Sequence, residues 1–148
     1  MARDIPPAPP KDLTPEQAEA YCQGSLPGLV GLTWISTKAD HIESRLALRP
    51  ELMAPNGYLH AASVIAAADT TAALACILNL PEGALNFTTI ELKSNFTGTA
   101  NSGHVRALAS PVHLGRASQV WDSVVTHEES GKAIAHFRCT QMILYPQA

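Results

Sequence analysis

Between His60 and Leu78 the sequence reads HAASVIAAADTTAALACIL, a stretch that would be apolar on nearly every side of a helix. This pattern predicts a long helix that is buried almost all round. Asp69 is the only residue in it that normally carries a charge at neutral pH. Because burying an unpaired carboxylate costs several kcal/mol, such a residue is paired, has a shifted pKa or takes part in chemistry. An exposed stripe of the helix, or a bond to Thr70 or Thr71, would also account for it.

Extended stretches are predicted on both sides of this helix, because apolar residues there alternate or run between turn signals. Two of them precede the helix and four, interpreted as a meander, follow it: Leu29–Thr37, Ile42–Leu48, Phe87–Phe96, His104–Leu114, Ala117–His127 and Ala133–Tyr145. One long helix packed against a mostly antiparallel sheet is an α+β architecture. A single sheet wrapped around the helix is the economical way to bury it.

The chain before the first strand is predicted to contain a flexible arm and one short helix. Residues 1–13 are rich in proline and are expected to be mobile. Thr14-Pro15-Glu16-Gln17 is typical of a helix start, with a capping threonine, a first-turn proline and a glutamine that completes a capping box. This amino-terminal helix is predicted to end near Gly24 and to belong to a single domain, residues 14–148.

Composition narrows the class of protein and its partners. With 148 residues, 46% hydrophobic and 16% charged, the chain fits one soluble domain. No apolar run approaches the roughly 20 residues of a membrane span and no signal peptide is recognised, so we expect a cytoplasmic protein without a membrane partner. A net charge of −3 argues against general nucleic-acid binding. Three scattered cysteines, Cys22, Cys76 and Cys139, predict buried thiols rather than a disulfide framework or a zinc site. We also expect no metal and no cofactor.

The start of the central helix is a candidate site for a developing negative charge. Asn56-Gly57 predicts a tight turn before His60, and the first helical amides, beginning with Ala61, lack partners inside the helix. Together with the helix dipole they can stabilise an oxyanion, although His60 would serve equally as a plain cap or packing residue. Ala61 and Asp69 are eight residues apart, about 12 Å along a helix. One carbonyl group cannot meet both on the same helix, so a shared site requires two antiparallel copies and at least a dimer.

These residues resemble a motif of the PaaI-like branch of the hotdog-fold thioesterases, in the superfamily of the 4-hydroxybenzoyl-CoA thioesterases. In that branch Gly-x-Leu-His-Gly-Gly opens the central helix, and an acidic residue follows the histidine nine positions later. Gly57-Tyr58-Leu59-His60 matches the element, and Asp69 within Ala68-Asp69-Thr70 falls on the acidic position. The similarity extends from about residue 30 to Tyr145. It implies a hotdog fold, in which an antiparallel sheet wraps one long helix, and hydrolysis of an acyl-CoA.

The resemblance implies roles for the residues around the start of the helix. Ala61, directly after His60, would supply the oxyanion-hole amide, with Gly57 and Ala62 against the substrate. Asp69 would act as general base on water or as nucleophile. The two glycines of the motif are Ala61 and Ala62 here. A backbone amide does not need glycine, but the added methyl groups would narrow the pocket.

Three further residues are assigned by the resemblance. Thr89 falls where a relative carries a serine that helps to place the water. Asn56 lies near, but not at, the position of an amide side chain that contacts the thioester. Arg116, between two predicted strands, would meet a phosphate of CoA or else be an ordinary solvated turn residue. Alternation in the strand of Thr89 predicts Thr89, Glu91 and Lys93 on the face opposite Ile90, Leu92 and Phe96.

The sequence therefore predicts acyl-CoA hydrolysis by a homodimer or a dimer of dimers. A non-catalytic acyl-CoA-binding protein is an alternative, suggested by the two alanines that replace glycines. A hydratase or dehydratase of the same fold would pair a histidine with an acid. Asp122 and His127 have one such spacing, but an odd separation in a strand puts them on opposite faces. His136-Phe137 is followed by Arg138 rather than by the proline of the other hydratase pattern.

Overall fold

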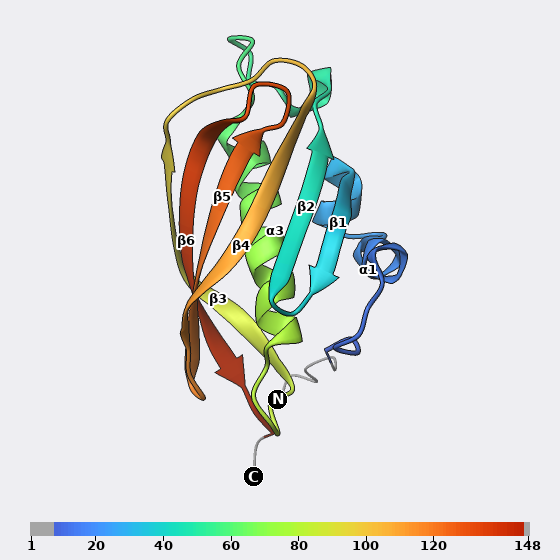
Figure 1. Cartoon of the computed structure of the whole chain (residues 1–148), viewed down its shortest axis with the longest axis vertical. Helices are drawn as coiled ribbons and strands as arrows, with labels where there is room; N and C mark the ends of the chain where they lie inside the picture. Colours follow the sequence, from blue (N-terminus) through green and yellow to red (C-terminus); the bar gives the residue numbers. More distant parts are fainter. Residues whose placement is uncertain (1–7, 147–148) are drawn as a thin grey trace.

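A computed structural model describes residues 8–146 as one sheet around one long helix (Figure 1). The elements, in chain order, are α1 (Pro15–Cys22), α2 (Leu26–Val30), β1 (Leu32–Lys38), β2 (His41–Ala47), a 3-10 turn (Pro50–Leu52), α3 (Ala61–Leu78), β3 (Asn86–Phe96), β4 (His104–Leu114), β5 (Ser118–His127) and β6 (Lys132–Leu144). The predicted α+β hotdog architecture, with an extra amino-terminal helix, is confirmed.

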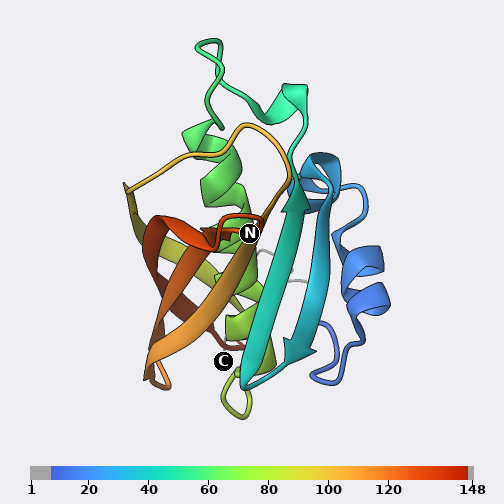
Figure 2. The ribbon, with the colours of Figure 1, turned by 45° about the horizontal axis from the view of Figure 1, so that its top comes forward.

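The six strands lie in the order β1-β2-β4-β5-β6-β3, and every neighbouring pair is antiparallel. The prediction of a four-strand meander after α3 holds for β4, β5 and β6 but is wrong for β3. This strand pairs with β6 at the far edge of the sheet, and residues 97–103 then cross the end of the molecule where α3 begins (Figure 1). The sheet curves around α3, as the tilted view shows (Figure 2).

The segment before β1 is more helical than the sequence predicted. Leu29 and Val30, expected to start a strand, belong to the short helix α2, which Gly31 ends with a φ of 80°. Glycine adopts a positive φ without steric strain, so Gly31 can end the helix in this conformation. The strand therefore begins only at Leu32. The capping box of α1 is present: Thr14 and Gln17 exchange hydrogen bonds between side chain and backbone.

The predicted flexible arm lies partly outside the described residues. Residues 1–7 are not described, whereas the next residues touch the domain. The Ala8 N–H donates to the Leu85 carbonyl over 3.1 Å, and the Leu13 carbonyl accepts a hydrogen bond from the Thr37 hydroxyl. These two hydrogen bonds attach the chain before α1 to the residue preceding β3 and to β1.

Small residues let α3 lie close against the sheet. Ala67, Ala68, Ala72 and Ala75 are buried, and the strands pack larger side chains such as Trp121 and Phe137 into the same core. Among the described residues α3 alone is long and apolar enough to cross a membrane, which the expectation of no such run had missed. Most of it is buried within the sheet, as expected for the core helix of a globular domain.

Trp121 of β5 tests how much the core depends on one large side chain. It is 1% exposed, and its indole N–H donates to the Gln119 side chain over 2.9 Å. We expect Trp121→Ala to lower the free energy of unfolding by about 3–5 kcal/mol, because it leaves a cavity and an unpaired acceptor. Urea unfolding would measure this, with Leu29→Ala, 75% exposed, as the control that changes it by less than about 0.5 kcal/mol.

Candidate active site

One side of α3 is left uncovered by the sheet. The residues of the helix that retain exposure recur every three or four positions: Ala61, Ala62, Ile65, Ala66, Asp69, Thr70 and Ala73. This spacing places them in one stripe along the helix. Next to the stripe is the edge strand β3, whose Leu92 and Phe96 remain 42% and 46% exposed. A helix that is apolar all round therefore has an apolar side that the other described residues, 8–146, leave partly exposed.

Asp69 lies in the middle of this stripe and is partly buried. Its Oδ1 is buried and has no hydrogen-bond partner among the described residues. Desolvation raises the pKa of this carboxyl above its ordinary value. Thr71 is not the missing partner, because its hydroxyl contacts the Ser44 hydroxyl and the Ala67 carbonyl at 2.6 Å each. Asp69 thus has the environment of a base whose proton affinity is increased, rather than of a paired structural carboxylate.

The start of α3 presents an unpaired backbone donor. His60 is the N-cap, and its Nδ1 accepts the Ala62 N–H over 2.9 Å, while its carbonyl accepts from Ser63 and Val64. Among the hydrogen bonds of residues 8–146, none uses the Ala61 N–H. With Nδ1 acting as acceptor, the neutral imidazole carries its proton on Nε2, so His60 is a second donor beside the Ala61 amide.

Ala61 lines a small hollow of about 190 Å³. Tyr58 and Leu59 line it from the loop before the helix, and Phe96, Gly98, Thr99 and Ile134 line it from β3, the crossover and β6. The chain crossing between β3 and β4 is therefore a wall of this hollow. Sequence reasoning did not assign Phe96, Gly98 or Thr99, because the crossover brings them to the helix start only in three dimensions.

Asn56 and Gly57 form the predicted tight turn ahead of the helix. Gly57 has a φ of 84°, which a side chain would strain, and the Asn56 Oδ1 accepts the Tyr58 N–H over 3.3 Å. Both residues are exposed at the tip of the loop, and neither lines the hollow at Ala61. The described chain thus brings His60, Ala61 and Ala62 together, with Asn56 and Gly57 further out.

Thr89 faces the helix because of a bulge in β3. Thr89 pairs with Gln141, whereas Glu91 pairs with Thr140, so the register shifts by one residue between them. The prediction that Thr89 shares a face with Glu91 and Lys93 is therefore wrong, since a bulge inserts an extra residue and reverses the alternation. Thr89 lies on the helix side together with Leu92 and Phe96.

Arg116 lies at the opposite end of α3 from Ala61. Its guanidinium stacks on the Tyr145 ring, 5.1 Å from the centroid, and its carbonyl accepts the Tyr145 hydroxyl over 2.8 Å. It lines a hollow of about 460 Å³ with Asn79, Glu82 and the neighbouring loop residues. Asn79 is ten residues beyond Asp69, about 15 Å along the helix axis.

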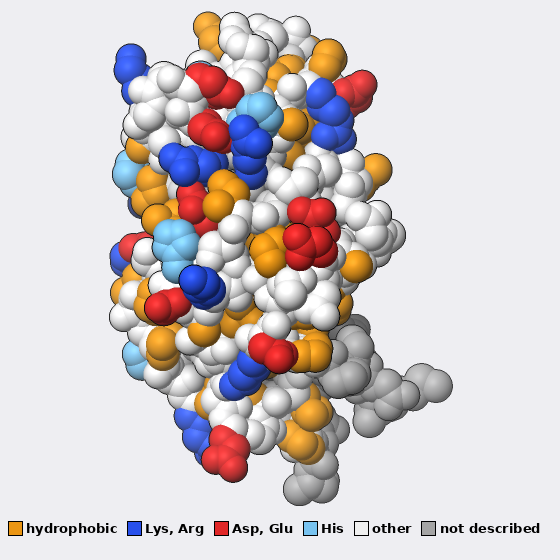
Figure 3. Space-filling model, turned by 45° about the vertical axis from the view of Figure 1, so that its right-hand side comes forward, with side chains coloured by type: hydrophobic (Ala, Val, Ile, Leu, Met, Phe, Trp, Pro, Cys, Tyr) orange, Lys and Arg blue, Asp and Glu red, His pale blue; other side chains and the backbone are white. Residues whose placement is uncertain are grey.

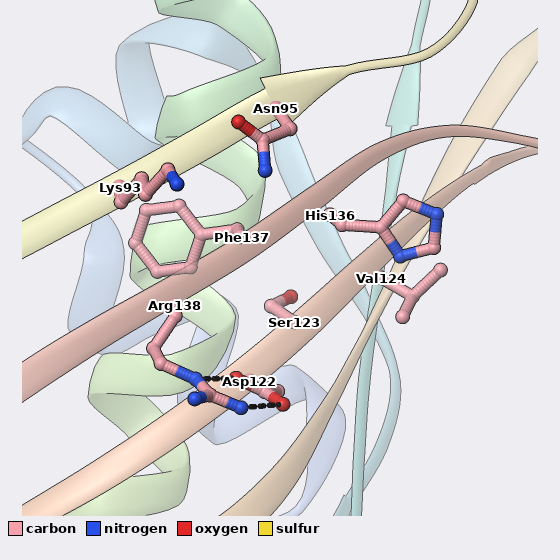
Figure 4. Close-up of a pocket in the computed structure, with 8 residues that line it drawn as sticks. All are labelled: Lys93, Asn95, Asp122, Ser123, Val124, His136, Phe137 and Arg138. Carbon is pink, nitrogen blue, oxygen red and sulfur yellow. Dashed lines mark hydrogen bonds and ion pairs between the residues drawn. The ribbon is translucent and has the colours of Figure 1, made fainter.

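The residue pair of the hydratase alternative is not brought together. Asp122 accepts two hydrogen bonds from Arg138, at 2.6 and 2.8 Å, on the outer face of the sheet (Figure 4). This contact lowers the pKa of Asp122. His127 instead contacts the Ser130 hydroxyl and Glu129 at the end of β5. The hollow of about 290 Å³ beside Asp122 and His136 is thus separated from Asp69 by the sheet.

Charges on the surface are mixed. On the face shown in Figure 3, acidic and basic side chains lie interspersed, without an extended basic area. Arginines of β2 and β4 form ion pairs of this kind: Arg45 with Glu128 at 2.7 Å and Arg106 with Glu43 at 3.3 Å. Within residues 8–146, no three His, Cys, Asp or Glu side chains are grouped so that they could hold a metal ion. The three cysteines are buried thiols, as predicted.

Known proteins share both this sequence and this arrangement. Residues 56–134 match the model of the thioesterase superfamily. A protein of Haemophilus influenzae described as an esterase is 32% identical over 120 residues, which cover 81% of this chain and 86% of that protein. The chain belongs to the thioesterase superfamily. The matched segment runs from the loop before α3 through the helix and β3, β4 and β5 to the first residues of β6, and so includes both Ala61 and Asp69.

Two further relatives cover most of the chain. A crystal structure of a thioesterase from Haemophilus influenzae has a TM-score of 0.84 and 28% identity, and the match covers 95% of this chain and 96% of that one. The 1,4-dihydroxy-2-naphthoyl-CoA hydrolase of Escherichia coli is 26% identical over 134 residues, covering 90% of this chain and 97% of that protein. The protein is thus a thioester hydrolase of the hotdog fold, and the resemblance found in the sequence is confirmed.

The raised pKa of Asp69 predicts how stability depends on pH. A carboxyl whose pKa is higher in the folded than in the unfolded chain destabilises the fold once it is ionised. We expect Asp69→Asn to unfold at a higher temperature than the wild type at pH 7. The difference should shrink as pH falls through the folded pKa and disappear below the ordinary aspartate pKa of 3.8, where both side chains are neutral. Thermal unfolding at a series of pH values would show it; equal curves at pH 7 would contradict the cost of burying this carboxylate.

Proposed function

We propose that the protein hydrolyses an acyl-CoA thioester at a site shared by two copies of the chain. The observation that carries this proposal is the uncovered stripe of α3, which holds the Ala61 amide and the partly buried Asp69 carboxylate. Within residues 8–146 the Ala61 N–H and the Asp69 Oδ1 have no hydrogen-bond partner. Eight residues, about 12 Å, separate them on one helix. One reacting carbonyl cannot reach both unless the carboxylate comes from a second copy.

A two-fold axis near Ile65 would complete the site. Ile65 is halfway between Ala61 and Asp69, so two antiparallel helices crossing there would bring each Ala61 beside the Asp69 of the other chain and create two equal sites. Ala62 and Ala66 on the stripe are small enough for close helix approach. The same association would cover the exposed Leu92 and Phe96 of β3, which are apolar side chains on the helix side of an edge strand.

Hydrolysis then follows from the donors and the base. The thioester carbonyl oxygen would accept the Ala61 N–H at the positive end of the helix, with the Nε2–H of His60 as a further donor to the oxyanion or the leaving sulfur. Asp69 of the other chain would take a proton from water, whose oxygen attacks the carbonyl carbon. The tetrahedral intermediate would collapse to the free acid and expel CoA as the thiolate, which recovers a proton from Asp69 or solvent.

A CoA thioester suits the layout and the relatives. One relative is named for hydrolysis of a naphthoyl-CoA. Arg116, with its hollow of about 460 Å³, lies some 15 Å beyond Asp69 along the helix. That separation would be spanned by the long pantetheine arm between the thioester and the phosphates of CoA. The guanidinium stacked on Tyr145 is held in place and remains a donor for phosphate.

Complementation between two inactive variants tests whether the site is shared. Ala61→Pro removes the unpaired N–H, and proline suits the first position of a helix. His60, with φ −65° and ψ 135°, already has the extended backbone that a following proline requires. We expect Ala61→Pro to lower kcat by about 10²–10³-fold. Asp69→Asn should lower it by orders of magnitude, since the base is lost.

Co-expression of the two variants should restore activity. A mixed dimer has one intact site, with Ala61 from one chain and Asp69 from the other, so random pairing of equal amounts returns about one quarter of wild-type turnover. Thiol release from a panel of acyl-CoA substrates would measure it. The double variant Ala61→Pro/Asp69→Asn, mixed with wild type, is the matched control for exchange of chains. Full wild-type turnover by Asp69→Asn alone would refute the assignment of the base, and the lack of any restoration would refute a site shared by Ala61 of one chain and Asp69 of the other. A wild-type protein that binds the acyl-CoA substrates without releasing thiol would be a binder.

Arg116→Ala tests the CoA contact. We expect KM for an acyl-CoA to rise about tenfold with kcat little changed, because a phosphate contact is made equally in the ground state and the transition state. The same acyl group on N-acetylcysteamine lacks the phosphates, and its KM should not change. An equal rise with both substrates would show that Arg116 acts through the structure of its loop rather than through CoA.

A further inference from the structure

A row of polar side chains crosses the helix side of the sheet beneath the second half of α3. Thr89 of β3, Gln141 of β6 and Gln119 of β5 are register neighbours, so they lie side by side across three strands. Both glutamines are almost completely buried, although the surrounding core is apolar. A buried amide is costly unless its hydrogen bonds are made, so its partners reveal what it holds.

Gln119 and Gln141 have different partners. Gln119 accepts the Trp121 indole N–H and donates to the Asn79 carbonyl at the end of α3, over 2.9 and 2.8 Å. These bonds tie the sheet to the helix terminus. Gln141 donates to the Cys139 thiol over 3.2 Å, and its Oε1 accepts the Thr89 hydroxyl over 2.8 Å. Gln141 therefore holds a residue on the open edge of the sheet, where a second chain would dock.

The chain has a specific device for turning Thr89 toward Gln141. The bulge between Thr89 and Glu91 reverses the alternation of β3, and without it Thr89 would share the outer face with Glu91. Bulges interrupt pairing and are often found where a side chain must be re-aimed beside a site. Here the result is one hydroxyl at the edge of an apolar face, with its proton donated inward to a buried amide.

The other end of this arrangement lies at Asp69. The pKa of the Cys139 thiol, the partner of Gln141, is raised to about 12. The main cause is burial of the thiol, and the next is the nearby negative charge of Asp69. Leu92, next to Cys139 in the register, continues the same face toward Phe96 and the hollow at Ala61. Thr89, Gln141 and Cys139 thus form a connected chain that begins at the open edge and ends beside Asp69.

We propose that Gln141 is a positioning residue that fixes the Thr89 hydroxyl as a hydrogen-bond acceptor for the attacking water. This inference rests on the proposed function. Because Thr89 gives its own proton to the Gln141 Oε1, the lone pairs of Thr89 face the site. A water molecule between Thr89 and Asp69 donates one proton to each, and its free lone pair is directed at the thioester carbon. Asp69 then removes its proton as the carbon–oxygen bond forms, while Thr89 keeps the other in place.

The test compares single and double variants. Thr89→Val and Gln141→Met remove one partner each at similar volume, and each should lower kcat about tenfold with KM little changed, the effect of one lost neutral hydrogen bond in the transition state. The double variant should be no slower than Thr89→Val, because Gln141 acts only through Thr89. Thr89→Ser, which keeps the hydroxyl, should retain most of the rate.

Two further measurements separate positioning from damage to the fold. In Gln141→Met the pH profile of kcat/KM should keep its rising limb, set by Asp69, at the wild-type pH and reach a lower plateau. A site opened to water would instead move that limb toward lower pH. Ser44→Ala, which loses the buried hydrogen bond to Thr71, is the control for a weakened core and should lower thermal stability without changing the pH profile.

The outcomes distinguish this inference from the proposed function. Rate losses that multiply in the double variant to about a hundredfold would overturn the role of Gln141 through Thr89. So would wild-type turnover by Gln141→Met, provided that Asp69→Asn remains inactive. Wild-type turnover by Asp69→Asn would instead overturn the proposed function itself, and the inference with it.

Discussion

A curved sheet can surround only part of a helix, and α3 is apolar on every side. This mismatch decides much of the molecule. The strands cover the faces that carry Ala67, Ala68, Ala72 and Ala75, and a stripe from Ala61 to Ala73 remains open beside the edge strand β3. Burial of apolar surface stabilises a fold in proportion to its area, so this stripe favours contact with another surface of the same chemistry. The one carboxylate on the helix lies within that stripe, which links association and chemistry.

Features set by neighbouring residues could be predicted from the sequence. The capping box at Thr14, the turn at Asn56-Gly57 and the ends of the central helix depend on local chemistry, and all were found at or within one residue of the predicted positions. Leu29 and Val30, the end of the short stretch LPGLV, were assigned to the following strand because a short apolar run suits a strand as well as a helix turn. Its conformation depends on Gly31, which ends the turn with a positive φ.

Features set by contacts between distant residues could not be predicted. β3 follows the helix yet pairs with β6, because the helix has already crossed the sheet and leaves the strand at the opposite edge. The bulge at residues 89–91 adds one residue to an alternating pattern, and one residue is enough to exchange the two faces. For the same reason Gln141 was missed: in RCTQMIL it reads as one more alternating polar residue, and only the register shows that it faces inward and meets Thr89.

The two alanines in place of the motif's glycines have a physical interpretation in this setting. In the proposed dimer the start of the stripe would approach its copy closely, which favours small side chains at Ala61 and Ala62. Alanine adds a single methyl group while it favours the helix by about 1 kcal/mol over glycine. The Ala61 N–H is unaffected by that methyl group, because the donor belongs to the backbone. Asp69 has the opposite effect on stability from the two alanines. Its burial weakens the fold, and the same burial raises its proton affinity. A chain that strengthens its helix at Ala61 and Ala62 can retain a buried carboxylate eight residues from Ala61, where the lost stability accompanies the raised proton affinity that the proposed base requires.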